Sequence, residues 1–207
     1  DQILIATSRG TKPDGGVHGI DPETGQVLWS FTDWQCNIAI PQPIHLGGGR
    51  MFITGGYGAG SYRFQVTRDG NHHYTISNPV KIRVCESKLQ LPIHFGEHIY
   101  ANSSDGPNGI VCLDEDGGLI WKSGRKNKFG AGPILIADDL IFALHGDNGV
   151  LSLLEAKPSG FNKLAEAKLL DGPHVWAPMA MSKGRLLIRD MGRMKCLDVT
   201  GNGNKPG

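Results

Sequence analysis

Two histidines at matching positions are the first candidates for binding chemistry in this sequence. His45 and His94 each follow a proline by two residues, in the similar segments PIHLGGGRMFI and PIHFGEHIY. Imidazole nitrogens bind metal ions, and a protonated imidazole attracts anions. Neither histidine has the spacing of a zinc motif such as HExxH or paired CxxC. The sequence therefore favours a structural or solvent-exposed role for both, and the alternative is that they bind a metal ion or an anion.

The four cysteines occupy two kinds of position in a sequence repeat. Cys36 and Cys85 each precede a repeated proline by seven residues, and Cys112 and Cys196 each precede an aspartate by two. Equivalent positions in packed sheets lie about 10 Å apart, whereas a disulfide needs Cα atoms within about 7 Å of each other. We expect four free thiols, buried or half-buried, with a Cys36–Cys85 disulfide as the alternative.

Other residues that could do chemistry carry weaker signals. No Gly-x-Ser-x-Gly nucleophile motif is present. The segment GGYGAG (55–60) is predicted to be a turn between strands, because a phosphate-binding loop must lead into a helix. The adjacent His72 and His73 are expected to point to opposite faces of one strand. A net charge of +1 gives no electrostatic footprint for nucleic acid or an anionic membrane. A basic cluster is therefore interpreted as a solvent-exposed loop: Lys122, Arg125, Lys126 and Lys128.

Glycine and proline predict the elements that position these residues. The 207-residue sequence contains 30 glycines and 12 prolines, which interrupt helices and favour short strands joined by turns. Residues 161–170 have helix-forming composition, but the repeat places a strand there, and we predict a strand. No apolar run approaches the ~20 residues that a transmembrane helix needs. The sequence thus predicts an all-β protein with no transmembrane segment.

A repeat of 45 residues on average organises the chain, with prolines at 43, 92, 133 and 178 opening similar segments. A second marker with a similar period is an alternating strand that ends in a polar residue. Each repeat contains four predicted antiparallel strands, which is the pattern of a β-propeller blade. His45 and His94 are then candidates to line the axial channel. The predicted blades are 1–33, 34–82, 83–123, 124–171 and 172–207, and their marker strands end at Asp21, Arg68, Asp114, Glu155 and Asp198.

The length of the sequence does not correspond to a whole number of blades. At 45 residues each, 207 residues correspond to 4.6 blades, because the first lacks its opening strand and the last stops after its third. Propellers close with roughly 4–8 blades. We expect one domain that is part of a propeller of roughly 7–8 blades. The alternatives are a second chain that closes the ring, and an unusual five-bladed ring.

The repeat resembles that of the pyrroloquinoline quinone (PQQ) dehydrogenases, whose blade motif is AxDxxTGKxxW. Residues 19–29, GIDPETGQVLW, match this motif with Gly for Ala and Gln for Lys, and residues 112–121, CLDEDGGLIW, form a copy one residue shorter. In the family the tryptophan docks between blades, and the aspartate and glycine shape the turn. The resemblance assigns these structural roles to Asp21, Gly25, Trp29, Asp114, Gly118 and Trp121.

The resemblance is particular to the non-catalytic PQQ-like propellers of secreted bacterial proteins, including those similar to the outer-membrane β-barrel assembly lipoprotein. Residues 176–198 are similar to a final blade of that group. This implies a periplasmic or otherwise extracytoplasmic location, although the chain itself shows no signal peptide. We expect a binding or scaffold module for a protein or a small ligand.

Two other functions stay open on the sequence. The first is part of a PQQ-dependent oxidoreductase, in which these blades supply a portion of the cofactor cavity. Enzymes of that kind carry an adjacent cysteine pair and acidic Ca²⁺ ligands, and this sequence has no Cys-Cys pair. We therefore predict no cofactor, and PQQ with calcium belongs to this alternative alone. The second is the sensor domain of a membrane-anchored signalling protein.

Overall fold

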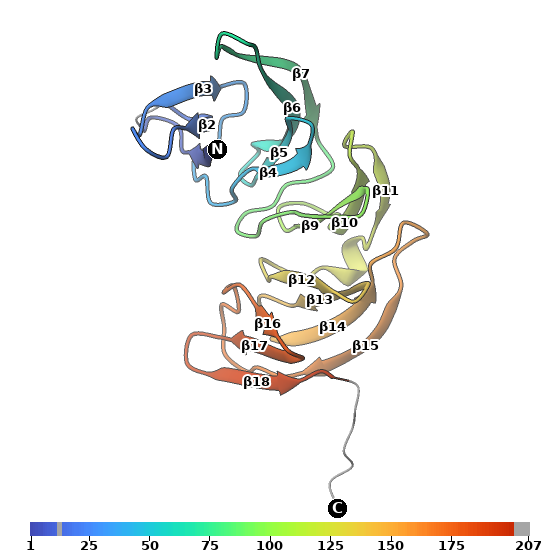
Figure 1. The fold of residues 1–207 in the computed structure, drawn as a ribbon. Coiled ribbons are helices and arrows are strands. Elements are labelled where there is room, and N and C mark those ends of the chain that lie inside the picture. Colours follow the sequence, from blue (N-terminus) through green and yellow to red (C-terminus); the bar gives the residue numbers. More distant parts are fainter. Residues whose placement is uncertain (12–13, 201–207) are drawn as a thin grey trace, which may run out of the picture. The chain divides into compact units, whose positions relative to one another are not determined.

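The computed structural model describes residues 1–11 and 14–200, and this part of the chain is built from strands (Figure 1). The strands form five antiparallel sheets, and in each sheet neighbouring strands follow one another in the chain. The described residues contain one helical element, the short 3-10 helix η1 (Arg125–Asn127), and the basic residues around it are exposed. No helix in this part of the chain is long and apolar enough to cross a membrane. The all-β prediction is confirmed.

The chain divides into two compact units, the first made of Asp1–Lys128 and Pro158–Phe161, the second of Phe129–Lys157 and the chain from Asn162 onward. The sheets of the first unit are β1 (Ile3–Thr7), β2 (Gly16–Ile20) and β3 (Val27–Phe31); β4 (Ile44–Gly47), β5 (Arg50–Gly55), β6 (Gly60–Arg68) and β7 (Tyr74–Ile82); and β8 (Ile93–Phe95), β9 (His98–Ser103), β10 (Gly109–Asp114) and β11 (Leu119–Lys122). The sheets of the second unit are β12 (Ile134–Ala137), β13 (Leu140–Leu144), β14 (Val150–Glu155) and β15 (Lys163–Lys168); and β16 (Ala180–Ser182), β17 (Arg185–Arg189) and β18 (Met194–Asp198). We number these sheets first to fifth in chain order.

The four-stranded antiparallel sheets confirm the predicted blade pattern. Within the described residues, the first and fifth sheets have three strands each. The strand predicted within 161–170 is β15, in which Ala165 and Ala167 pair with Leu153 and Leu151 of β14. Pairing with a neighbouring strand here outweighs the helix-forming composition, as tertiary context commonly does. The segment GGYGAG joins β5 to β6 and is a turn, as predicted.

Aromatic side chains fill the space between the first and second sheets. Phe31 of β3 stacks on Phe64 of β6, with ring centroids 4.1 Å apart. The fully buried Trp34 belongs to the same cluster and donates a hydrogen bond from Nε1 to the Gly60 carbonyl oxygen at 3.2 Å. Between the second and third sheets, Phe52 packs with aliphatic side chains of β9 and β10. These two cores fix the three sheets of the first unit relative to one another.

The core of the second unit corrects one prediction. Phe142 of the fourth sheet packs with Leu186 and Ile188 of the fifth. Because side chains alternate along a strand, Leu187 lies on the opposite face of the fifth sheet, where it is 40% exposed. Cys196 pairs with Leu187 across the strands and is exposed, not buried or half-buried as predicted. The packed face of this sheet carries Leu186 and Ile188, and Cys196 does not belong to it.

His72 and His73 also differ from expectation. They lie in the turn between β6 and β7, and not on a strand. The Asp69 carboxylate accepts hydrogen bonds from the backbone N–H groups of Asn71 and His73, at 2.8 and 2.9 Å. An aspartate that binds backbone donors two residues onward favours a turn over a continued strand. His72 accordingly adopts a positive φ of 67°.

Candidate functional site

The motif aspartates organise the turns that follow their strands. Asp21 Oδ1 accepts hydrogen bonds from the backbone N–H groups of Thr24 and Glu23, both at 2.9 Å. These bonds favour the ionised form and lower the pKa of Asp21. Gly25 donates to the Asp21 carbonyl oxygen at a φ of 72°, a conformation that costs glycine little. In the second copy, Asp114 Oδ1 accepts from Gly118 N at 2.7 Å.

The motif tryptophans lie in packed interiors of the first unit. Trp29 is 6% exposed, lies with its ring edge-on to Phe64 of the second sheet at 6.1 Å, and donates from Nε1 to Gln2 Oε1 at 2.6 Å. Trp121 is buried, with its ring centroid 6.0 Å from that of Tyr100 and 6.0 Å from that of Phe161. Both tryptophans are therefore packed against neighbouring aromatic rings, which is the kind of contact that a structural role requires.

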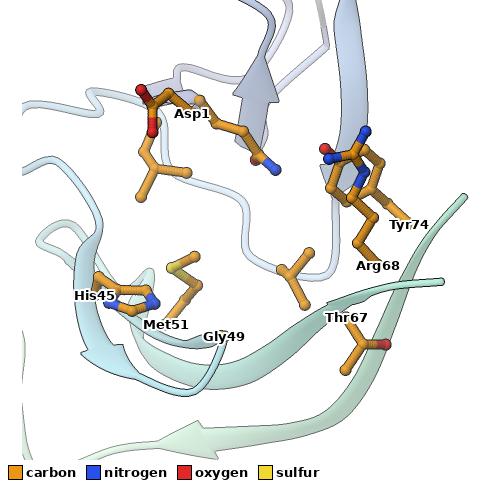
Figure 2. Close-up of a pocket in the computed structure, with 10 residues that line it drawn as sticks. Asp1, His45, Gly49, Met51, Thr67, Arg68 and Tyr74 are labelled. Carbon is orange, nitrogen blue, oxygen red and sulfur yellow. The ribbon is translucent and has the colours of Figure 1, made fainter. Parts of the chain in front are cut away.

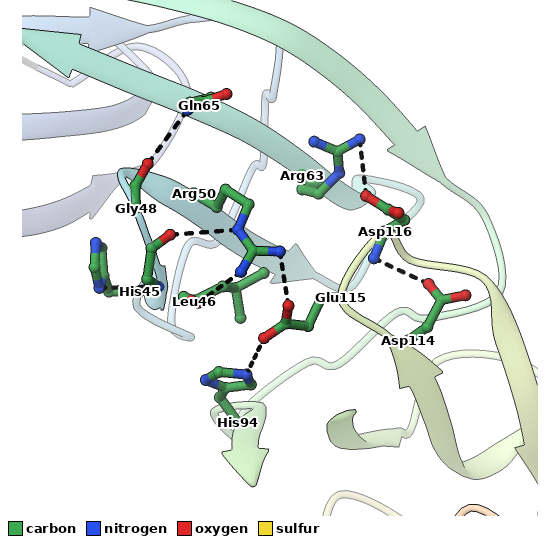
Figure 3. Close-up of polar contacts among 11 residues, drawn as sticks. His45, Leu46, Gly48, Arg50, Arg63, Gln65, His94, Asp114, Glu115 and Asp116 are labelled. Carbon is green, nitrogen blue, oxygen red and sulfur yellow. Dashed lines mark hydrogen bonds and ion pairs between the residues drawn. The ribbon is translucent and has the colours of Figure 1, made fainter. Parts of the chain in front are cut away.

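The two candidate histidines have different partners (Figure 3). His94 Nε2 lies 2.7 Å from Glu115 Oε1. His45 is exposed, and its Nδ1 accepts a hydrogen bond from the backbone N–H of Gly47 at 3.2 Å. The structure therefore does not give them a shared partner, and among the described residues no group of three His, Cys, Asp or Glu side chains could hold a metal ion.

Glu115 instead joins the second and third sheets through an ion pair that the sequence did not suggest. Its Oε2 lies 2.7 Å from Arg50 Nη1, and Arg50 also donates to the carbonyl oxygens of Leu46 and Gly47, at 3.2 and 3.3 Å. Beside this group, Arg63 Nη2 lies 3.3 Å from Asp116 Oδ1 (Figure 3). The hydrogen bond from Arg50 lowers the pKa of Glu115, and His94 adds to the effect.

Replacing Glu115 with glutamine is expected to destabilise the first unit by about 1 kcal/mol at neutral pH, since the pair is partly solvated. A carboxyl group whose pKa is lowered by folding stabilises the protein above its unfolded pKa. That contribution disappears as the pH falls through the lower, folded value. Urea unfolding of wild type and Glu115→Gln should therefore differ at pH 7, and the difference should shrink as the pH is lowered through the folded pKa of Glu115. The exposed Glu97→Gln is the control, and an equal loss in both variants would exclude the ion pair as the cause.

The four cysteines are free, and three of them are shielded from solvent. Burial raises the pKa of Cys85 and Cys112 to about 11 and also raises that of Cys36. Since the thiolate is the reactive form, we expect iodoacetamide at pH 8 to label one thiol of the native protein, Cys196. Mass spectrometry of labelled peptides before and after denaturation measures this. Rapid alkylation of the native Cys196→Ser variant would contradict the prediction that Cys196 is the reactive thiol.

One end of the first unit carries four exposed apolar side chains. The connection into β4 lies at the same end of the second sheet as the β5–β6 turn, because β4 and β5 run antiparallel. The connection into β8 lies at the same end of the third sheet as the β9–β10 loop for the same reason. Cys36 Sγ, in the connection into β4, lies 3.7 Å from the Gly56 carbonyl oxygen in the β5–β6 turn, and Asp105 in the β9–β10 loop accepts a hydrogen bond from the backbone N–H of Tyr57 in the same turn. We call this the loop surface, and it consists of Ile38, Ile40, Tyr57 and Leu91, all between 42% and 48% exposed.

Tyr57 lies in the β5–β6 turn and is held there by polar contacts. Its φ is 60°, in the left-handed region that non-glycine residues seldom adopt. The Asp105 carboxylate accepts the Tyr57 backbone N–H at 2.5 Å. Lys88 Nζ lies 5.2 Å from the centre of the tyrosine ring and 3.2 Å from Asp105 Oδ1. Strained residues cluster at functional sites, and the side chain of Tyr57 is 48% exposed to solvent.

A cleft of about 410 Å³ opens between the first and second sheets (Figure 2). Met51 and Val66 form its apolar floor, and both belong to the buried cluster between these sheets. His45 and Arg68 lie toward opposite sides in the view of Figure 2. The marker strands of the repeat end in an acidic residue in every case except Arg68. This exception is the feature of the sequence that could have identified Arg68 as a candidate binding residue.

Comparison with known proteins gives one family and one fold similarity. A family model described as outer membrane protein assembly factor BamB matches residues 13–159. A search of curated proteins finds no match. The chain is similar in structure to a provisionally assigned 6-phosphogluconolactonase from Bacteroides uniformis ATCC 8492, with a TM-score of 0.56 and 14% identity over 95% of this chain and 67% of that one. Similarity at this level of identity shows a shared fold and carries no functional assignment.

Proposed function

The chain belongs to the family described as outer membrane protein assembly factor BamB, and we propose that it is a non-catalytic, extracytoplasmic module that binds a protein partner. The loop surface is the proposed contact. The observation that carries this proposal is Tyr57, an exposed aromatic residue fixed in a strained conformation by Asp105 and Lys88. The family description supports a partner with a role in outer-membrane protein assembly.

The physical case rests on the cost of ordering an interface. Binding loses affinity when flexible side chains and loops must become fixed. Asp105 and Lys88 already hold Tyr57 in the free protein, so ordering this residue adds little to that cost. Tyrosine is enriched among residues that dominate binding energy, because its ring offers apolar area and its hydroxyl a hydrogen bond. Ile38, Ile40 and Leu91, exposed on the connections into β4 and β8, would add apolar area to the proposed contact.

A photo-crosslinking amino acid at position 57, in the full chain expressed in its own cell envelope, tests the contact. We expect one specific adduct whose partner is an envelope assembly protein. The matched control is the same substitution at Leu164, which is also exposed but lies on β15 in the second unit. Equal adducts from both positions, or an adduct with a cytoplasmic protein, would contradict the proposal. Fractionation of the cell envelope tests the location directly.

Replacing Tyr57 with glycine separates binding from folding. Glycine adopts φ of 60° without strain, so relief of strain offsets the loss of the Lys88 contact, and the stability should change by less than about 1 kcal/mol. Affinity for the crosslinked partner should fall at least tenfold, as expected for a residue at the centre of an interface. A variant with unchanged affinity would show that the partner binds elsewhere.

A further inference from the structure

The cleft between the first and second sheets has no part in the proposed protein contact. Its floor is apolar: Met51 and Val66 are buried, and the half-buried Leu4 and Tyr74 pack against the same cluster. Its volume of about 410 Å³ lies within the range of roughly 300–1,000 Å³ that is typical of small-molecule sites. An apolar floor of this size stabilises the apolar part of a ligand by removing it from water.

Arg68 supplies the charge at one side of the cleft. Its guanidinium carbon lies 5.5 Å from the centre of the Tyr74 ring, and Nη2 contacts His72 Nδ1. Within residues 1–11 and 14–200, no carboxylate forms an ion pair with it. A guanidinium has five N–H donors, so most of them are available. Tyr74 also orients the planar group, which matters because arginine binds carboxylates through two parallel hydrogen bonds.

Other polar groups around the floor limit what can bind. His45 Nδ1 accepts the Gly47 N–H, so the neutral ring carries its proton on Nε2 and presents a donor. Asp1 lines the cleft, and Asp21 and Glu23 line an adjoining hollow that shares Arg68 and Tyr74. A multiply charged anion such as phosphate would meet these carboxylates with one arginine in its favour. A single carboxylate on an apolar body fits better.

We propose that this cleft binds a small amphipathic carboxylate, with the carboxylate on Arg68 and the apolar part over Met51 and Val66. Tyr74 keeps the guanidinium in place, and the chemistry required of the ligand is one negative charge joined to an apolar chain or ring. This site is independent of the loop surface, so substitution of Tyr57 should leave it intact.

Titration of the full chain with octanoate, below its micellar concentration, tests the site. Calorimetry should show saturable one-to-one binding, and the uncharged octanamide should bind about tenfold more weakly, as expected for the loss of a charge-assisted hydrogen bond. In Arg68→Gln this preference for the acid over the amide should disappear. Arg189→Gln is the matched control, since Arg189 is an exposed arginine on β17, and it should bind both compounds like wild type.

The methionine methyl signals in an NMR spectrum locate the ligand. Met51 should shift on addition of octanoate, while the exposed Met191 and Met194 should not. Three results would overturn the proposal: no saturable binding, a preference for the acid that survives in Arg68→Gln, or shifts confined to Met191 and Met194. Because each readout measures ligand binding directly, none of them depends on the proposed protein partner.

Discussion

Trp29→Ala is expected to lower the free energy of unfolding of the first unit by about 3–5 kcal/mol, the usual cost of truncating a buried tryptophan. The indole is 6% exposed, contacts Phe64 of the next sheet and closes the core between the two sheets. Removing it leaves a cavity that rigid sheets cannot fill. The hydrogen bond from Nε1 to Gln2 is lost as well.

Urea unfolding followed by circular dichroism measures this loss, and Trp176→Ala provides the matched control. Trp176 is 40% exposed, so its truncation should cost less than about 1 kcal/mol. If Trp29→Ala were as stable as Trp176→Ala, the packing of the motif tryptophan would not contribute to the stability of the core. In that case the structural role that the family resemblance assigns to Trp29 would not hold for this chain.

Gly49→Ala is expected to destabilise the protein by about 3 kcal/mol or more, the sum of left-handed backbone strain and overpacking. Gly49 has a φ of 79°, and an added Cβ would clash with the carbonyl oxygen of Val66. The two backbones approach closely because Val66 N donates to Gly49 O at 2.8 Å. Since Val66 lies in the cleft floor, octanoate binding should weaken in parallel.

The neighbouring Gly48 provides the matched control for this substitution. It also has a positive φ, 58°, but an added Cβ would meet nothing within 4 Å. Gly48→Ala should therefore cost about 1 kcal/mol, the strain alone. The difference between the two variants in thermal or urea unfolding measures the steric contribution. Equal losses would mean that the backbone near Val66 moves away without cost.

The turns of the repeat could be predicted from sequence because they depend on neighbours in the chain. Asp21 and Gly25 are four residues apart, as are Asp114 and Gly118, and in both copies the aspartate accepts hydrogen bonds from backbone N–H groups of the following turn. Gly19 stands where the family motif has alanine, and contacts in the tertiary structure explain this difference. An added Cβ there would clash with the Trp29 indole and with Gln2, so this copy of the motif accommodates no alanine.

The pairing of His94 with Glu115 could not be predicted in the same way. His45 and His94 are equivalent in sequence, and the residues after their marker strands, Asp69 and Glu115, are both acidic. Asp69, however, accepts backbone hydrogen bonds within its own turn, whereas Glu115 reaches Arg50 on another sheet. Equivalent acidic residues thus have different partners in the two sheets. The β6–β7 hairpin of the second sheet is longer than the β10–β11 hairpin of the third.

The sequence by itself determined the all-β repeat, its four-stranded sheets and its turn chemistry, because these follow from alternation along strands and from contacts within a few residues. Tertiary structure alone decided that Tyr57 projects from the loop surface, that Cys196 is exposed, and that Arg68 borders an apolar cleft. Each of these depends on which sheet packs against which face. Arg50 and Glu115 are 65 residues apart, and a contact at that separation exists because whole sheets stack, which no local pattern of residues specifies.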